Sequence, residues 1–329
     1  MANRDLAIAH GGGLIAARAR FPAAPEPWID LSTGINAVPY PIPPLSPTAY
    51  QRLPEPEEVR RLEAAAARAY GVADASMVVA APGTQILISL LPRLLRLDSV
   101  AIVGPTYAEH ASAWTAGGSA VTNVDGIQAA ETAPGAVLCN PNNPDGRRTP
   151  AVELVKLATR LEVLVVDEAF ADLEEPGLSL APMLPANAVV LRSFGKTYGL
   201  AGLRLGFAIA RPALARTIRI ALGPWAVSGA AVEIGTAALA DTAWLAAARA
   251  RLIQDTAQLD WLLGEAGLRV IGGTRLFRLS AASGNTMFDR LGHAGILVRR
   301  FEAEPTWLRF GIPSGAWGRL KAALGQPNP

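Results

Sequence analysis

The chain has 329 residues, 50% of them apolar, and this length suits one large domain or two smaller ones. Thirty basic and 28 acidic residues leave a formal net charge of +2, which argues against a nucleic-acid-binding protein with its clustered basic face. The single cysteine, Cys139, excludes an internal disulfide bond and fits a reducing compartment.

The first fifty residues are rich in proline and glycine and have no regular hydrophobic period. The opening "MANRDLAIAHGGG" contains Asp5 and lacks the long apolar core of a secretory signal. The segment "PYPIPPLSP" over 39–47 predicts an extended arm, because proline disfavours a helix at the residue before it. The uncharged run over 75–92 approaches the length of a membrane span, but "APGTQ" divides it. We therefore expect no membrane partner and a cytoplasmic protein.

A helix is predicted over 57–70, where "EEVRRLEAAAARAY" is amphipathic and Gly71 ends it. Short apolar runs then alternate with helical patterns. Strands are predicted over 76–81, 99–104, 135–140, 162–170, 187–195 and 203–210. Helices are predicted over 84–97, 108–117 and 150–161 and from Pro212. Continuous apolar strands separated by helices predict an α/β fold with a mainly parallel sheet and helices on both faces.

The pattern changes at about residue 241. One long helix is predicted over 242–267, followed by two strands that pair, over 268–273 and 274–280, and by a further helix, two strands and a last helix. We predict three parts. An N-terminal arm over 1–48 packs with a small α+β domain over 241–329, and a large domain occupies 49–240.

Polar residues follow four of the predicted strands. They lie in "APGTQ" over 81–85, "CNPNNPDG" over 139–146, "VVDEAF" over 165–170 and "RSFGK" over 192–196. Ligands of open α/β sheets bind beyond the carboxyl ends of the strands. One large ligand could therefore be contacted by all four segments.

Lys196 is one of only three lysines among the thirty basic residues. A lysine that forms a Schiff base cannot be replaced by arginine, which has no accessible neutral form. Asp167 ends an apolar run, so its buried carboxylate needs a cationic partner. Either Asp167 and Lys196 form an ion pair, or they contact a protonated ring nitrogen and an aldehyde of one cofactor. Nearby glycines, Gly195 among them, are expected to let the backbone approach a flat ring.

The motifs occur in an order that resembles the class I/II aminotransferases, pyridoxal-phosphate (PLP) enzymes of fold type I. They are "APGTQ", "GPTYAEH", "NPNNPDG", "VVDEAF", "SFGKTYGLAGLRLGF" and "LRFGIP", and they cover nearly the whole chain. The resemblance implies a seven-stranded, mainly parallel sheet, a small C-terminal domain joined by the N-terminal arm, and a homodimer. The "HGGG" and "DLSTGIN" segments are similar to those of members that decarboxylate L-threonine O-3-phosphate in cobalamin synthesis.

The resemblance also implies roles for individual residues. Lys196 forms the Schiff base and moves protons, Asp167 pairs with the pyridinium nitrogen, Asn143 donates to the ring hydroxyl oxygen, and Tyr107 stacks on the ring. The residues expected to complete the cofactor site, mostly around its phosphate, are Gly83, Thr84, Gln85, Ser193 and Arg204.

The substrate is expected to be a small phosphorylated amino acid with two anionic ends. Arg309 is assigned to its carboxylate, since the arginine fork suits that group. The residues assigned to the rest of the substrate are His10, Gly11, Ser32, Asn36 and Arg299. The leading reaction is decarboxylation of L-threonine O-3-phosphate to (R)-1-amino-2-propanol phosphate. The alternatives are an aminotransferase of the histidinol-phosphate type and a protein of this fold without turnover.

Three positions depart from the family pattern. Phe170 stands where many members have tyrosine, and Asp145 stands in a turn where threonine is usual, with little expected consequence. Leu53 replaces a tyrosine that reaches the partner subunit's cofactor, a role that Tyr50 is a candidate to fill.

A metal site is not expected, because the three histidines are far apart in the sequence and Cys139 suits a small buried apolar position.

Overall fold

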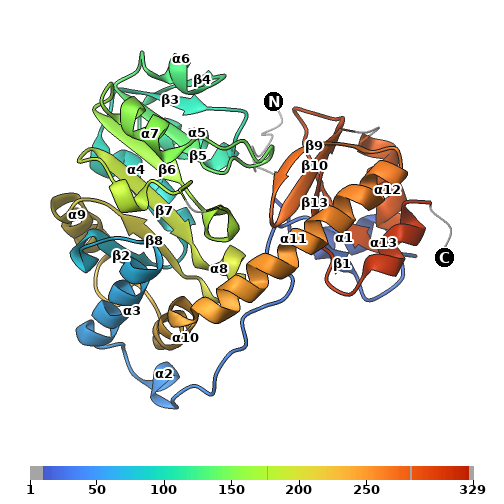
Figure 1. Ribbon diagram of the computed structural model, residues 1–329, viewed down its shortest axis with the longest axis horizontal. Helices are drawn as coiled ribbons and strands as arrows, with labels where there is room; N and C mark the ends of the chain where they lie inside the picture. The colour runs from blue at the N-terminus through green and yellow to red at the C-terminus, as the bar shows by residue number, and fades with distance from the viewer. Residues whose placement is uncertain (1–9, 176, 282–283, 326–329) are drawn as a thin grey trace, which may run out of the picture. The chain divides into compact units, whose positions relative to one another are not determined.

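The computed structural model describes residues 10–175, 177–281 and 284–325 (Figure 1). The chain divides into two compact units, Val38–Ala250 and the combination of Met1–Ala37 with Arg251–Pro329. These boundaries differ from the predicted 48/49 and 240/241. Tyr40 and Trp244, outside the predicted large domain, both pack against Tyr198 within Val38–Ala250, with ring centroids 6.0 and 5.3 Å from that of Tyr198.

The unit Val38–Ala250 contains a seven-stranded sheet. Its strands are β2 (Val78–Ala81), β3 (Ser99–Val103), β4 (Ala120–Val124), β5 (Gly135–Cys139), β6 (Val163–Asp167), β7 (Ala188–Ser193) and β8 (Gly206–Ile209). The strand order is β2-β8-β7-β6-β5-β3-β4, and only β8 runs antiparallel to its neighbours. The mainly parallel sheet is confirmed. The edge strand β4 was not predicted, because "AVTNV" is largely exposed and lacks a continuous apolar run.

Both faces of this sheet are covered, and the strand residues show why. Alternate side chains of β6 enter different cores: Leu164 and Val166 join one cluster, and Val165 joins the other. The first cluster includes residues of α3, α7 and α10, and the second includes residues of α4, α5 and α9. A strand that buries both of its faces reads as a continuous apolar run, which is the pattern seen in the sequence.

The helices of this unit differ widely in length. They are α2 (Thr48–Gln51), α3 (Pro56–Ala69), α4 (Thr84–Leu95), α5 (Ala108–Ala116), α6 (Ile127–Ala130), α7 (Ala151–Ala158), α8 (Phe194–Thr197), α9 (Pro212–Leu222) and α10 (Gly229–Ala240). A capping box formed by Glu55 and Glu58, with Pro56 between them, begins α3. The sequence missed α10, because "GAAVEIGTAALA" is apolar almost all round.

The other unit combines the N-terminal segment with the C-terminal part of the chain. It holds α1 (Leu14–Arg20), most of α11 (Thr242–Glu265), α12 (Gly284–His293) and α13 (Trp317–Ala323). Its four-stranded antiparallel sheet has the order β12 (Arg299–Arg300), β13 (Trp307–Gly311), β10 (Phe277–Ala281), β9 (Arg269–Thr274). The predicted pairing of β9 with β10 is confirmed. The N-terminal segment joins this unit because β1 (Ile29–Asp30) pairs in parallel with β11 (Ile296–Leu297).

Within the described part of the chain, no helix has both the length and the apolar character needed to cross a lipid bilayer.

Candidate active site

The N-terminus of α4 forms a cradle with the turn before β8. Gly83 precedes the helix with φ +85°, and Arg204 has φ +53°, a left-handed conformation that is uncommon for arginine. A Cβ atom on Gly83 would lie 2.6 Å from Nη2 of Arg204. A Cβ atom on Gly206 would lie 2.9 Å from the backbone nitrogen of Thr84. The absence of a side chain at Gly83 and at Gly206 therefore lets the Arg204 guanidinium and the turn before β8 lie close to the free N–H groups of α4.

Ser193 lies beside this cradle. It ends β7 and pairs with Gly206 of β8, and it is 9% exposed. The structure thus brings together four of the residues that the sequence assigned to a phosphate: Gly83, Thr84, Ser193 and Arg204. A helix N-terminus with a guanidinium group is suited to bind a phosphate.

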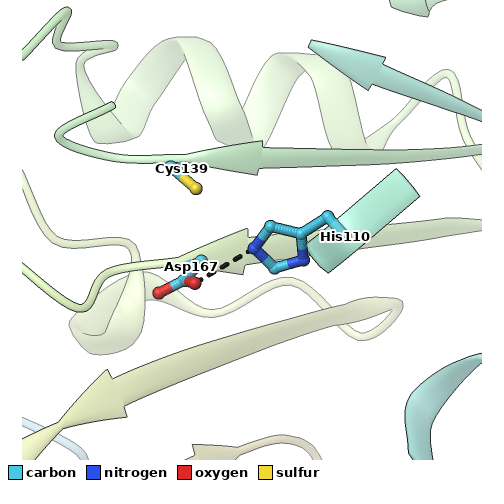
Figure 2. A group of neighbouring side chains, drawn as sticks. All are labelled: His110, Cys139 and Asp167. Carbon is cyan, nitrogen blue, oxygen red and sulfur yellow. Dashed lines mark hydrogen bonds and ion pairs between the residues drawn. The ribbon is translucent and has the colours of Figure 1, made fainter. Parts of the chain in front are cut away.

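Asp167 lies at the carboxyl end of β6 in a buried cluster (Figure 2). Its Oδ2 lies 3.0 Å from Nε2 of His110, the third residue of α5. Its Oδ1 accepts a hydrogen bond of 2.9 Å from the backbone N–H of Ala169. Cys139 is the cross-strand partner of Asp167, because β5 and β6 end in register. Both carboxylate oxygens of Asp167 are therefore held in place.

For both Asp167 and His110, burial shifts the pKa in one direction and the neighbouring groups shift it in the other. Burial alone would raise the pKa of Asp167. The hydrogen bond and charge of His110, with smaller effects from Lys196 and Ala169, outweigh it and hold that pKa below its ordinary value. Burial would lower the pKa of His110, but Cys139 and the Asp167 carboxylate raise it to about 10. The pair therefore favours an ionised carboxylate beside a protonated imidazole.

The sequence missed this cluster. It gave His110 no role and treated Cys139 only as a small apolar residue, although both are buried next to Asp167. The three ligand atoms lie within 4.8 Å of one another, a spacing that a metal ion could also use. Although the histidines are far apart in the sequence, His110, Cys139 and Asp167 come together from three separate elements. The predicted absence of a metal stays a prediction.

Tyr107 is held by a chain of side chains. Its hydroxyl donates a hydrogen bond of 3.2 Å to Oε1 of Gln85, and Nε2 of Gln85 donates one of 2.9 Å to Glu109. The Tyr107 ring meets the His110 ring edge to face, with centroids 6.0 Å apart. Gln85, predicted to bind the cofactor, thus uses its side chain to fix the ring of Tyr107.

The turn that carries Asn143 is fixed by its neighbours. Asn143 itself is half-buried. Oδ1 of Asp145 accepts hydrogen bonds from Nδ2 of Asn142 (2.8 Å) and from the backbone N–H of Arg147 (2.9 Å). The side chain of Asn140 pairs with the backbone of Thr149 at 2.9 Å in both directions. Asp145 therefore stabilises the turn in which threonine is usual.

Lys196 lies on α8, a helix of four residues, and its side chain is half-buried. Its Nζ lies 5.3 Å from the centroid of the Phe170 ring. A Cβ atom on Gly195 would lie 2.7 Å from Cα of Ala201, so this glycine is needed for the close approach of the following turn. Its expected role beside a flat ring stays a prediction.

The other unit contains two arginines on neighbouring strands. Arg309 of β13 is 6% exposed, and its Nη2 donates a hydrogen bond of 2.7 Å to the backbone oxygen of Ser32. Arg299 of β12 is the direct cross-strand partner of Arg309, so both side chains leave the sheet on the same face. Like charges at paired positions repel each other, and a bound anion would relieve that repulsion.

The N-terminal segment packs around Ser32 in the same unit. Oγ of Ser32 accepts a hydrogen bond of 2.7 Å from the N–H of Gly12 and donates one of 2.6 Å to Asp30. A Cβ atom on Gly11 would lie 2.4 Å from the backbone oxygen of Ser32. Ser32 thus holds the segment that carries the exposed His10.

Asn36 is buried in this unit as well. Its Oδ1 accepts a hydrogen bond of 2.7 Å from Nη2 of Arg251, which fixes the orientation of its amide.

The residues of Val38–Ala250 fit PLP by their chemistry. The cradle at Gly83 and Arg204 suits its phosphate, the buried Asp167 carboxylate suits a protonated ring nitrogen, and Lys196 supplies the only lysine at these strand ends. Asn143 and Tyr107 lie on the turns that follow the neighbouring strands β5 and β3.

Comparisons with known proteins agree with this arrangement. The family model described as "Aminotransferase class I and II" matches residues 45–325. A threonine-phosphate decarboxylase from Sinorhizobium sp is 44% identical, with 96% of this chain and 97% of that protein covered. One from Pseudomonas aeruginosa is 38% identical with the same coverage. The crystal structure of histidinol-phosphate aminotransferase from Sinorhizobium meliloti with pyridoxal-5′-phosphate has a TM-score of 0.80, 22% identity and 97% coverage of both chains.

Proposed function

Because the chain belongs to the class I and II aminotransferase family, we propose that it uses PLP to decarboxylate L-threonine O-3-phosphate. The product would be (R)-1-amino-2-propanol phosphate, a precursor in cobalamin synthesis. The observation that carries the proposal is the 44% identity to a threonine-phosphate decarboxylase over 96% of the chain. A buried carboxylate, a lysine and a phosphate cradle at the ends of one sheet support it.

The cofactor would be held by backbone N–H groups of α4 and by side chains at the edge of the sheet where its parallel strands end. Arg204, Ser193 and the N–H groups of α4 at Gly83 and Thr84 would bind its phosphate. When bound, PLP supplies a protonated ring that accepts the electron pair left when the carboxylate departs. Tyr107, fixed by Gln85, would pack on the ring, and Asn143 would donate to its hydroxyl oxygen.

Asp167 would keep the proton on the ring nitrogen. An ionised carboxylate stabilises a cationic neighbour, and the low pKa of Asp167 keeps that carboxylate ionised. His110 adds a donor on the far side of the carboxylate and so favours the same state.

Lys196 would hold the cofactor and then act on the substrate. A primary amine at this position can return a proton to the substrate Cα after carbon dioxide leaves. Its neighbour Phe170 offers an apolar ring to one side of Nζ.

Arg309 and Arg299 would bind the two anionic ends of the substrate. Arg309 is held by Ser32 and fits the carboxylate, while Arg299 on the paired strand fits the phosphate. His10, Gly11, Ser32 and Asn36 would complete the phosphate contacts.

The proposal is tested by supplying the purified protein with PLP and L-threonine O-3-phosphate. We expect carbon dioxide and an amino-propanol phosphate, released without 2-oxoglutarate. A parallel reaction contains histidinol phosphate and 2-oxoglutarate. Glutamate formed only in the second reaction would show an aminotransferase and contradict the proposal.

Lys196→Ala is expected to abolish decarboxylation and the visible absorbance of the bound cofactor, because no other residue can replace the covalent amine. Lys156→Ala is the matched control, since Lys156 is exposed on α7. Borohydride reduction followed by peptide mapping should find the pyridoxyl group on the peptide of Lys196 in the wild type and in Lys156→Ala. A label elsewhere would refute the assignment of Lys196.

We further propose a cytoplasmic homodimer. The helix α2 exposes Tyr50 (75%) and Leu53 follows it at 60%, beside a pocket of about 310 Å³ between α2, α3 and α10. Tyr50 is thus available to a second subunit. Light scattering on the purified protein should give twice the mass of one chain, and a monomer with full activity would exclude this arrangement.

A further inference from the structure

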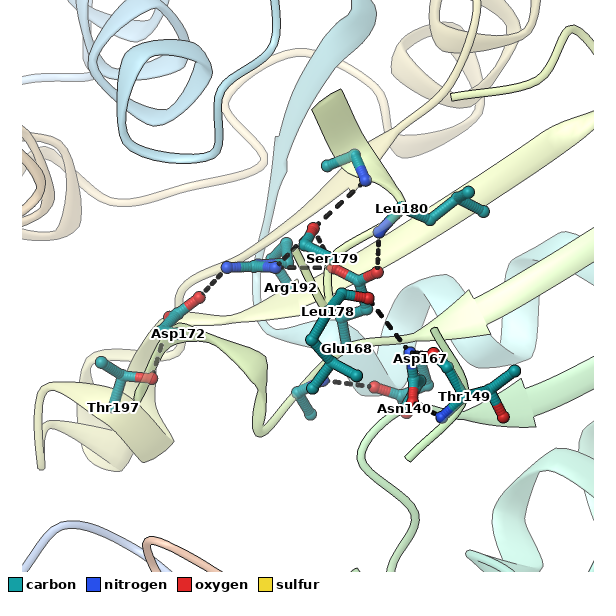
Figure 3. Close-up of polar contacts among 12 residues, drawn as sticks. Asn140, Thr149, Asp167, Glu168, Asp172, Leu178, Ser179, Leu180, Arg192 and Thr197 are labelled. Carbon is teal, nitrogen blue, oxygen red and sulfur yellow. Dashed lines mark hydrogen bonds and ion pairs between the residues drawn. The ribbon is translucent and has the colours of Figure 1, made fainter. Parts of the chain in front are cut away.

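A buried group of charges lies next to the catalytic residues but has no role in the proposed reaction (Figure 3). Glu168 is 0% exposed, Asp172 9% and Arg192 5%. Nη1 of Arg192 donates a hydrogen bond of 2.6 Å to Glu168, and Nη2 donates a short one to Asp172. We call Glu168, Asp172, Arg192 and their hydroxyl partners Ser179 and Thr197 the buried ion network.

Most polar groups of the network are paired, and Nε of Arg192 is the exception, buried without a hydrogen-bond partner among the described residues. Oγ of Ser179 and the N–H of Leu180 each donate to Glu168 at 2.6 Å. Burial alone would lower the pKa of Arg192, but Asp172 and Glu168 raise it above its ordinary value. Arg192 therefore stays charged, whereas burial raises the pKa of Glu168 in spite of the opposing effect of Arg192.

Stability alone is a weak reason for such a group. Desolvation of buried ions offsets much of their attraction, and apolar residues of similar volume often stabilise a protein equally well. Directional hydrogen bonds between buried ions also fix the positions of the side chains that form them.

The two ends of the network adjoin the two residues that carry the proposed chemistry. Glu168 directly follows Asp167 at the end of β6, and Thr197 directly follows Lys196 in α8. Oγ1 of Thr197 donates a hydrogen bond of 2.8 Å to Oδ2 of Asp172, and Thr197 is 0% exposed. The network therefore connects the end of β6, which carries Asp167, with the helix after β7, which carries Lys196.

The helix α8 depends on such contacts. It has four residues, and a single isolated turn is not stable in water. Phe194 of this helix stacks on Tyr198, the residue that follows the helix, at 4.3 Å, and Tyr198 stacks on Trp244 at 5.3 Å. Aromatic packing is not directional in the way that a hydrogen bond is. The hydrogen bond of Thr197 therefore supplies the directional contact that orients the helix.

We propose that Asp172 and Arg192 are positioning residues that act through Thr197 to hold Lys196 at a set distance from Asp167. The inference rests on the proposed function, because it assumes that Lys196 binds the cofactor. A displacement of about 1 Å at a reacting group can lower a rate by about 100-fold. Loss of the Thr197 hydrogen bond should therefore lower kcat more than it raises KM.

The test uses the holoenzyme and replaces one hydroxyl. Thr197→Val keeps the volume and removes the bond to Asp172, Thr197→Ser keeps the bond, and Asp172→Asn weakens it from the other side. The matched control is Thr256→Val, which removes a buried hydroxyl whose bond of 2.7 Å goes to Leu252 in α11.

Four quantities are measured: kcat, KM, the pH midpoint of the visible absorbance of the Lys196-bound cofactor, and the unfolding temperature. We expect Thr197→Val to lower kcat by about 10- to 100-fold with KM changed by less than about 3-fold, and to move the pH midpoint. Thr197→Ser should restore all of these to near the wild type. Thr256→Val should lower the unfolding temperature without moving kcat or the midpoint.

The outcomes separate the two proposals. A wild-type protein with no pyridoxyl label on Lys196 would overturn the proposed function. A labelled wild type with Thr197→Val and Asp172→Asn indistinguishable from Thr256→Val in kcat and midpoint would overturn the positioning role alone. If Thr197→Val does not fold, Asp172→Asn decides the question by the same criteria.

Discussion

His110 changes the chemistry of a single carboxylate. Its Nε2 lies 3.0 Å from Asp167, and both side chains are buried. At the residue scale, the charge state of Asp167 therefore depends on a neighbour 57 positions away.

The stability of this pair should depend on pH. The folded pKa of His110 is raised from 6.5 to about 10, so its stabilising contribution is complete below 6.5 and is lost as the pH rises through 10. The folded pKa of Asp167 is lowered from 3.8, so its contribution is present above 3.8 and is lost as the pH falls through the folded value. The pair is therefore most stabilising between these two ordinary values.

For the cofactor-free protein, we expect the unfolding free energy to fall more steeply between pH 7 and pH 10 in the wild type than in His110→Gln. The difference in slope should approach about 1.4 kcal/mol per pH unit. Urea titrations at several pH values measure it, and the other titrating groups cancel because both proteins share them. Parallel curves would show that His110 does not hold an extra proton in the folded state.

At the scale of elements, the cradle depends on how α4 begins. A side chain on Gly83 would meet both a strained backbone and the guanidinium of Arg204. Gly118, after α5, has a similar φ of +94° but no atom within 4 Å of its ideal Cβ. A substitution at Gly118 would therefore strain the backbone only, whereas one at Gly83 would strain the backbone and also displace Arg204.

Gly83→Ala and Gly118→Ala should both lower the unfolding free energy by about 1–3 kcal/mol, because alanine disfavours positive φ. Only Gly83→Ala should also weaken PLP binding, by about 10-fold or more, because it displaces Arg204. Absorbance titration of the cofactor-free proteins measures the affinity. Equal affinities in the two variants would argue against a phosphate site at this helix.

The paired strands β12 and β13 permit a second test at this scale. Arg309→Lys keeps the charge but loses the two-pronged contact with a carboxylate, so KM should rise about 10-fold or more. Cofactor content, measured by absorbance, should not change. Arg278→Lys, on the neighbouring β10 and paired with Asp260, is the control. A loss of cofactor equal to the loss of substrate affinity would show that Arg309 has been misassigned.

At the scale of the whole molecule, the two-sided core of the sheet decides stability. Leu164 is 0% exposed in β6, the strand that ends at Asp167, whereas Val152 is 56% exposed on α7. Leu164→Ala should lower the unfolding free energy by about 2–5 kcal/mol, and Val152→Ala should change it by less than about 0.5 kcal/mol. Denaturant titration measures both. A small effect at Leu164 would indicate that the core around β6 relaxes to fill the cavity.

The sequence predicted most strands of the large sheet because each is a continuous apolar run. It missed β4 and α10, whose patterns are typical of neither an amphipathic helix nor a buried strand. The compact unit that holds the large sheet begins at Val38 and so includes Tyr40, which the sequence assigned to the N-terminal arm, because nothing local indicates that this residue packs on Tyr198.

The sequence by itself determined most of the elements and the family, and it singled out the lysine that the proposed chemistry requires, since each depends on residues that are contiguous or nearly so. Only the tertiary structure decided that His110 and Cys139 adjoin Asp167, and that Asp172 binds Thr197. The physical reason is that these contacts join side chains of separate elements. Their distances follow from how strands and helices pack, and no local pattern of residues encodes that packing.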